Sequence, residues 1–148
     1  MASHASVIQK AIRRMRNLLP RKPYVQVAGS LLAPPERRWC DAEFKDDHFY
    51  LSSAEGEARR LMTRLHCTPT TRILDVGCGQ GRLAIGLLRV LGELDYIGVD
   101  VHRPSIAWCQ AYIERYHPSF RFHHIDVYNA RYNPTGSPIE RNFRFAVE

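Results

Sequence analysis

The stretch that decides the fold of this chain is residues 73–82, which read Ile-Leu-Asp-Val-Gly-Cys-Gly-Gln-Gly-Arg. Apolar residues lead into Asp75, and glycines then follow at every second position, as Gly77, Gly79 and Gly81. Glycine accepts a positive φ, and it lets a ligand approach the backbone where a Cβ would collide with it. A helix-like pattern begins next, and the start of a helix offers unpaired N–H groups. The stretch therefore predicts a strand that turns into a helix around a ligand.

Two other nucleotide-binding loops do not fit this stretch. A phosphate-binding P-loop ends in Gly-Lys-Ser/Thr, whereas residues 81–83 are Gly-Arg-Leu. The dinucleotide fingerprint is G-x-G-x-x-G, and counting from Gly77 its last position falls on Arg82. A dehydrogenase is therefore disfavoured. A glycine-rich turn without a ligand remains as the plain alternative.

With its acid two residues before the first glycine, the segment resembles the first motif of class I, Rossmann-like methyltransferases that use S-adenosylmethionine. Their pattern is apolar-apolar-Asp/Glu-apolar-Gly-x-Gly-x-Gly, which residues 73–81 match. The resemblance implies an α/β fold: a Rossmann-like parallel sheet with helices on both faces and S-adenosylmethionine as cofactor. The cofactor-binding residues that it implies in this stretch are Asp75, Gly77, Cys78, Gly79 and Gly81.

A second acid follows the next predicted strand at a fitting distance. Asp100 ends the β-rich run 94–100 and comes 19 residues after Gly81, close to the ~20 expected for an acid that binds ribose. A carboxylate suits that task because it accepts hydrogen bonds from both ribose hydroxyls. Val101 and His102 follow directly and are expected to border the cofactor. A turn or a helix cap is the alternative role for Asp100.

A third acid follows the run 120–125, which is the next predicted strand. The resemblance implies that Asp126 and Val127 lie near the adenine. A solvated turn after a strand explains Asp126 nearly as well.

Helical patterns fill the intervals between these strands. Residues 82–91 carry an apolar face followed by Gly92, and residues 104–115 form a second predicted helix with Pro104 in its first turn. Alternating strands and helices predict a parallel sheet that binds ligands beyond the carboxyl ends of its strands. Relatives carry seven strands and this chain holds three, so we expect a sheet truncated after strand 3. The unpaired edge of its first strand invites self-association.

The composition is that of an ordinary globular protein. The chain has 148 residues, 45% hydrophobic and 24% charged. It contains no apolar run of about 18 residues and no secretory signal at its start, so we expect a cytoplasmic protein without a transmembrane segment. Its four cysteines form no C-x-x-C pair, and no metal site is predicted.

The basic charge is concentrated at the N-terminus. Residues 1–38 carry eight Lys/Arg and one acid, whereas residues 39–148 carry 13 Lys/Arg and 14 acids. Residues 7–19 predict a basic amphipathic helix, interpreted as a peripheral packing helix, as a helix that binds a membrane surface or a partner protein, or as a targeting peptide. Residues 20–35 hold four prolines and predict a linker. We therefore divide the chain into this helix and linker, 1–38, and the first part of a methyltransferase domain, 39–148.

Two further segments flank the predicted sheet. Residues 39–66 predict a lead-in helix, with Ser52 and Glu55 placed as a capping box. Residues 128–138 predict a long loop that forms part of a substrate lid.

The expected function is S-adenosylmethionine-dependent methyl transfer to a small-molecule acceptor, with this chain supplying the cofactor-binding half. Neither the acceptor nor a catalytic residue is assigned, because methyl transfer depends on placing the two reactants in line more than on acid–base groups. The alternative is a non-catalytic, methyltransferase-like module that binds a membrane surface or a partner protein through its basic N-terminal helix.

Overall fold

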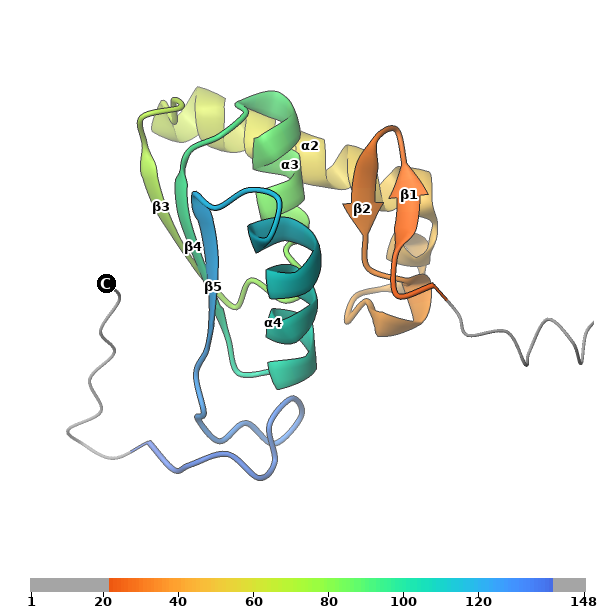
Figure 1. The fold of residues 1–148 in the computed structure, drawn as a ribbon, viewed down its shortest axis with the longest axis vertical. Coiled ribbons are helices and arrows are strands. Elements are labelled where there is room, and N and C mark those ends of the chain that lie inside the picture. Colours follow the sequence, from red (N-terminus) through yellow and green to blue (C-terminus); the bar gives the residue numbers. More distant parts are fainter. Residues whose placement is uncertain (1–21, 140–148) are drawn as a thin grey trace, which may run out of the picture.

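A computed structural model describes residues 22–139 of the chain. The central sheet has three parallel strands in the order β3 (Arg72–Val76), β4 (Asp95–Asp100) and β5 (Phe120–His124). The crossovers between them are α3 (Arg82–Val90) and α4 (Arg103–Cys109), the second of which continues into the π-helical segment η3 (Gln110–Glu114). Each lies close to a segment that the periodicity of the sequence predicted. The parallel α/β fold is therefore confirmed (Figure 1).

Within the described residues, the helices gather on one face of the sheet (Figure 1). The side chains of a strand alternate between the two faces, and Tyr96, Phe120 and Phe122 are buried on the helix side. On the opposite face Leu74 and Val76 are 54% and 75% exposed. The outer edge of β3 pairs with no other strand within residues 22–139.

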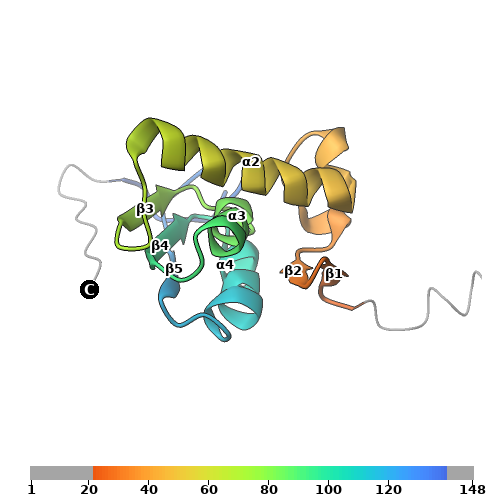
Figure 2. The same ribbon diagram turned by 90° about the horizontal axis from the view of Figure 1, so that it is seen from above.

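A long helix, α2 (Asp47–Leu65), packs against α3 and runs from the sheet to the N-terminal hairpin (Figure 2). The two helices touch backbone to backbone, because a Cβ on Gly86 would lie 2.1 Å from the carbonyl oxygen of Ala54. No helix of the described part of the chain is long and apolar enough to cross a membrane.

The predicted capping box of this helix is wrong. Helix α2 begins at Asp47, and the Asp46 carboxylate accepts a hydrogen bond from the Phe49 N–H at 2.7 Å. An aspartate in extended conformation is a favoured N-cap, so the helix begins well before Ser52. The Ser52 hydroxyl instead donates to the Phe49 carbonyl inside the helix, at 3.1 Å.

The predicted linker is also wrong for the residues that the structure describes. They form a hairpin, β1 (Val25–Val27) and β2 (Ser30–Leu32), and two short 3-10 helices, η1 (Pro35–Arg37) and η2 (Ala42–Lys45). The hairpin closes through Ala28 and Gly29, both with positive φ, as tight two-residue turns require. Leu32 and Ala33 then enter the core with no exposed surface. The amphipathic helix predicted for residues 7–19 lies outside the described residues.

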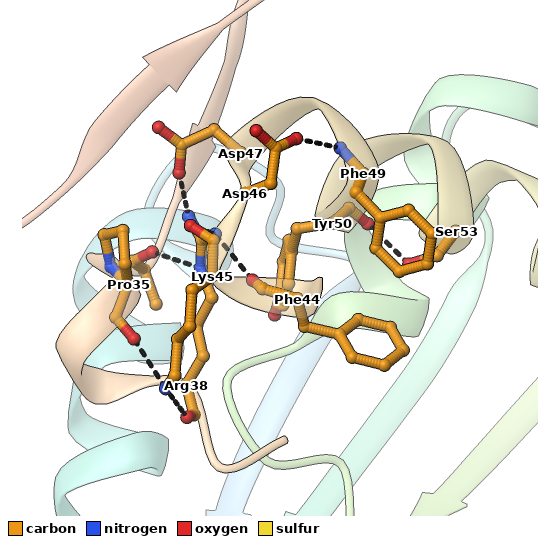
Figure 3. A network of polar contacts seen from close by, with 10 residues as sticks. Pro35, Arg38, Phe44, Lys45, Asp46, Asp47, Phe49, Tyr50 and Ser53 are labelled. Carbon is orange, nitrogen blue, oxygen red and sulfur yellow. Dashed lines mark hydrogen bonds and ion pairs between the residues drawn. The ribbon is translucent and has the colours of Figure 1, made fainter. Parts of the chain in front are cut away.

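A buried arginine ties this N-terminal segment to α2 (Figure 3). The side chain of Arg38 is 0% exposed. Its guanidinium donates to the carbonyls of Ala33 and Phe44, each at 2.9 Å, and to the Asp47 carboxylate at 2.6 Å. It also lies 4.3 Å from the ring centre of Tyr50. The chain around residues 33–47 is therefore fixed by one cation that satisfies several backbone groups at once.

Candidate functional site

A cavity of about 380 Å³ lies at the carboxyl ends of β3, β4 and β5. Its size is in the range of small-molecule sites, and its place is where parallel sheets bind ligands. Five of the residues predicted to bind a cofactor line it: Gly77, Gly79, Asp100, Val101 and His102. The structure thus brings the glycine loop and the end of the second strand of the sheet together around one space.

Two glycines present bare backbone to this cavity. Gly77 and Gly79 have φ values of 86° and 54°, which favour glycine. A Cβ at either position would meet no protein atom within 4 Å. Protein packing therefore does not require these glycines, and the space beside them is open to a ligand.

The carboxylate of Asp100 is held in place by backbone N–H groups from both sides. Gly79 N–H donates to Oδ2 at 2.8 Å, and His102 N–H donates to Oδ1 at 2.7 Å. Each carboxylate oxygen has a second lone pair, so both can still accept from a ligand hydroxyl. The glycine loop is itself fixed to the sheet, because Gly77 N–H donates to the Val99 carbonyl at 2.8 Å.

A chain of polar side chains continues from the glycine loop to His102. Gln80, in the loop, donates to the Ser105 hydroxyl at 2.9 Å, and that hydroxyl lies 2.6 Å from His102 Nδ1. Burial lowers the pKa of His102, against the opposing effect of the Asp100 charge. His102 is therefore neutral at pH 7. Gln80 also donates to the Arg37 carbonyl, which joins the cavity to the N-terminal segment.

Three residues of the predicted motif face the protein interior instead of the cavity. Asp75 accepts a hydrogen bond from the Tyr96 hydroxyl at 2.6 Å, and burial raises the pKa of Asp75. Cys78 is 7% exposed, and burial raises the pKa of its thiol, so it stays protonated. Gly81 begins α3 where a Cβ would lie 2.6 Å from Ile113. These residues support the glycine loop on the side away from the cavity.

Asp126 and Val127 also lie outside the cavity. The Asp126 carboxylate accepts from Asn133 and Ser137, each at 3.2 Å, and these hydrogen bonds lower its pKa. Asp126 therefore organises the loop after β5. Val127 is 8% exposed and packs beneath that loop. Ile125, the residue before Asp126, is the part of this strand exit that lines the cavity.

Eight residues of the cavity wall were not among the predicted site residues: Trp39, Val76, Gln80, Val99, Ser105, Ile125, Asn129 and Tyr132. Gln80 could have been found, because it stands inside the glycine motif. Tyr132 lies in the predicted loop 128–138, whereas Trp39 carries no local signal, since the segments that bear these two rings meet only in the folded chain. No group of three or more potential metal ligands occurs among the described residues.

Comparison with known proteins bears on the class of protein to which this sequence is similar. A family described as a methyltransferase domain matches residues 73–137, which include the glycine loop, Asp100 and β5. A curated tRNA (guanine-N(7)-)-methyltransferase of Halorhodospira halophila is 42% identical over 38 residues, covering 26% of this chain and 16% of that protein. Residues 73–137 therefore match a methyltransferase domain, as the resemblance of residues 73–82 implied.

Two solved structures are also similar. YjhP from E. coli shares 22% identity and a TM-score of 0.42, covering 65% of this chain and 38% of that one. Geranyl diphosphate C-methyltransferase from Streptomyces coelicolor, solved with Mg2+, geranyl diphosphate and S-adenosyl-L-homocysteine, shares 18% identity and a TM-score of 0.38, covering 79% and 47%. This chain thus spans less than half the length of each of these three proteins.

Proposed function

We propose that this chain binds S-adenosylmethionine in the cavity at the carboxyl ends of the sheet and serves the transfer of its methyl group to a small-molecule acceptor. The observation that carries the proposal is the Asp100 carboxylate, oriented by two backbone N–H groups beside the open backbone of Gly77 and Gly79. That arrangement offers a diol two acceptors and offers the rest of the ligand an unobstructed backbone. The match to methyltransferase domains supports it independently.

Methyl transfer from S-adenosylmethionine requires little acid–base catalysis from this chain. When bound, the cofactor supplies a methyl group on a sulfonium, which is already a good leaving group. The task of the protein is to hold the reactants in line, which alone can be worth effective molarities of ~10⁵–10⁸ M. Asp100 would hold the ribose of a bound cofactor, and the open Gly77–Gly79 backbone would leave room for the rest of it. We assign no general base, because the neutral His102 lies beside Asp100, at the ribose end.

A small-molecule acceptor fits the near-neutral charge of residues 39–148. Residues 39–148 carry 13 basic and 14 acidic residues, whereas a polyanionic acceptor requires a basic surface to neutralise its phosphates. The relative that methylates tRNA matches this chain over only 38 residues. Its acceptor is therefore not carried over to this proposal.

Calorimetric titration of the full chain with S-adenosylmethionine and S-adenosylhomocysteine tests the proposal. Asp100→Asn should weaken both by roughly 10–150-fold, since hydrogen bonds to a charged group contribute about 1.5–3 kcal/mol. Asp95→Asn is the matched control: it lies at the opposite end of the same strand, pairs with Arg72 and Arg121, and should leave binding unchanged. Gly79→Arg should abolish binding, because its side chain would occupy the cavity.

The titration of the wild-type chain can refute the proposed function. If the wild-type chain binds neither compound, the proposed function is refuted. If the chain also pellets with anionic liposomes, and pelleting is lost when residues 1–20 are deleted, the membrane-binding module is the better description.

A further inference from the structure

Three aromatic rings from distant parts of the chain meet at the wall of the cavity. Trp39 follows η1, His102 follows β4, and Tyr132 belongs to the loop after β5; all three line the cavity. The ring centre of Trp39 lies 5.1 Å from that of His102 and 5.6 Å from that of Tyr132, with interplanar angles of 76° and 87°. Both contacts have edge-to-face geometry, so neither neighbouring ring lies parallel to the Trp39 ring. Trp39 remains 49% exposed.

The position of Trp39 is fixed by the two residues that precede it. Arg38 is buried and holds the backbone of residues 33–44 through its hydrogen bonds. One residue earlier, the Arg37 carbonyl accepts from Gln80 of the glycine loop. The loop that borders the cavity therefore sets the distance between the indole and the cavity. A large ring held this firmly loses little conformational entropy when it packs against a ligand.

The hydrogen-bond chain also reaches His102. The Ser105 hydroxyl accepts from Gln80 and has a hydrogen of its own that it can donate to His102 Nδ1. A neutral imidazole whose Nδ1 accepts carries its proton on Nε2. The aromatic wall therefore combines flat π surfaces with one N–H donor. A purine, which is flat and has ring nitrogens that accept hydrogen bonds, matches this chemistry.

We propose that Trp39 is the stacking partner of the purine of the bound cofactor, and that its contacts with Tyr132 and His102 hold the indole ring in place. This inference rests on the proposed function of the cavity and adds to it a residue from outside the methyltransferase motif. It also assigns a role to the Arg38 network, which positions the stacking ring. Stacking of a base on an aromatic side chain is sequence-tolerant and substantial.

Tryptophan fluorescence tests this inference, because the chain has two tryptophans. Trp108 is 3% exposed, and its Nε1–H donates to the Pro23 carbonyl at 2.7 Å. We expect S-adenosylhomocysteine and adenosine to quench the Trp39 emission of the full chain. In Trp39→Phe the quench should disappear while calorimetry shows binding retained within about fivefold. In Trp39→Ala both ligands should bind roughly 5–150-fold more weakly.

Calorimetry and fluorescence together distinguish failure of the cofactor site from failure of the stacking role. If the wild-type chain does not bind S-adenosylhomocysteine in calorimetry, the proposed function itself fails. If it binds and Trp39→Phe shows the full quench, the signal comes from Trp108 and the stacking role is overturned, while the cofactor site stands. Equal affinity of a folded Trp39→Ala, checked by circular dichroism, overturns it as well. Because the Phe variant keeps a ring, this test does not depend on the Ala variant folding.

Discussion

Replacing Arg38 by methionine should destabilise the whole domain, although Arg38 lies outside the methyltransferase motif. The change keeps the length and much of the apolar stem of the side chain, and it removes every guanidinium donor. The carbonyl of Ala33, a residue with no exposed surface, then loses its partner, as does the carbonyl of Phe44. The Asp47 carboxylate loses its cation.

The structure sets the size of this effect. Removing one member of a buried ion pair costs about 3–5 kcal/mol, and an unsatisfied buried carbonyl costs about 1–3 kcal/mol within that total. The Asp47 side chain is 30% exposed and regains water, so the lower part of the range applies. A loss of about 3–4 kcal/mol corresponds to a fall in Tm of roughly 10–15 °C for a chain of this length.

Urea and thermal unfolding followed by circular dichroism measure the loss. Arg37→Met is the matched control, because Arg37 is the preceding residue and is exposed; its free energy of unfolding should change by less than about 0.5 kcal/mol. A difference between the two variants below about 1 kcal/mol would refute the role of Arg38 as the anchor of residues 33–47. A large loss in both would show that the charge of the segment, and not the buried network, matters.

Three further predictions follow from other contacts. Gly86→Ala should lower the free energy of unfolding in urea by about 3 kcal/mol or more, because its Cβ would overlap the Ala54 carbonyl. Gly56→Ala, which has open space on α2, should raise that free energy by about 0.5–1 kcal/mol. Similar losses in both variants would contradict the close contact between α2 and α3. Since burial lowers the pKa of His102, the unfolded chain takes up its proton first. Stability should therefore be full above about pH 6.5 and fall below it, and an NMR titration midpoint of His102 at or above 6.5 would contradict this. Leu74→Lys should reduce concentration-dependent association in sedimentation velocity, because it places a charge on the exposed face of the sheet. A wild-type chain that stays monomeric would contradict the expected self-association.

The local sequence predicted the sheet and its crossovers because these depend on short-range signals. The alternation of apolar residues, the glycines at 77, 79 and 81, and Gly92 after α3 each act within a few residues of their position. The acid at the end of the second strand of the sheet was found in the same way. Asp100 lies at the cavity because parallel strands bring their carboxyl ends together, so strand order is enough to place it.

The N-terminal segment was misjudged for the opposite reason. Its prolines and scattered charges are typical of a linker, but Leu32 and Ala33 belong to a core cluster that extends to Phe122, and Arg38 is buried against residues 33–50. The spacing between Ser52 and Glu55 predicts a capping box, whereas the helix already begins at Asp47. A local pattern does not reveal that another residue fills the same role earlier in the chain.

Residues 73–100 by themselves predict the class of fold, the resemblance to methyltransferases and the acid expected to bind ribose. They can do so because glycine spacing and strand periodicity are properties of neighbouring residues. Which motif side chains face the cavity, and which support it from behind, follows from the pleat of the strands and the packing of the helices. Asp75 and Cys78 turn inward, and Trp39 and Tyr132 arrive from segments 93 residues apart in the chain. The meeting of those two rings is a long-range contact, so it exists only once the chain has folded.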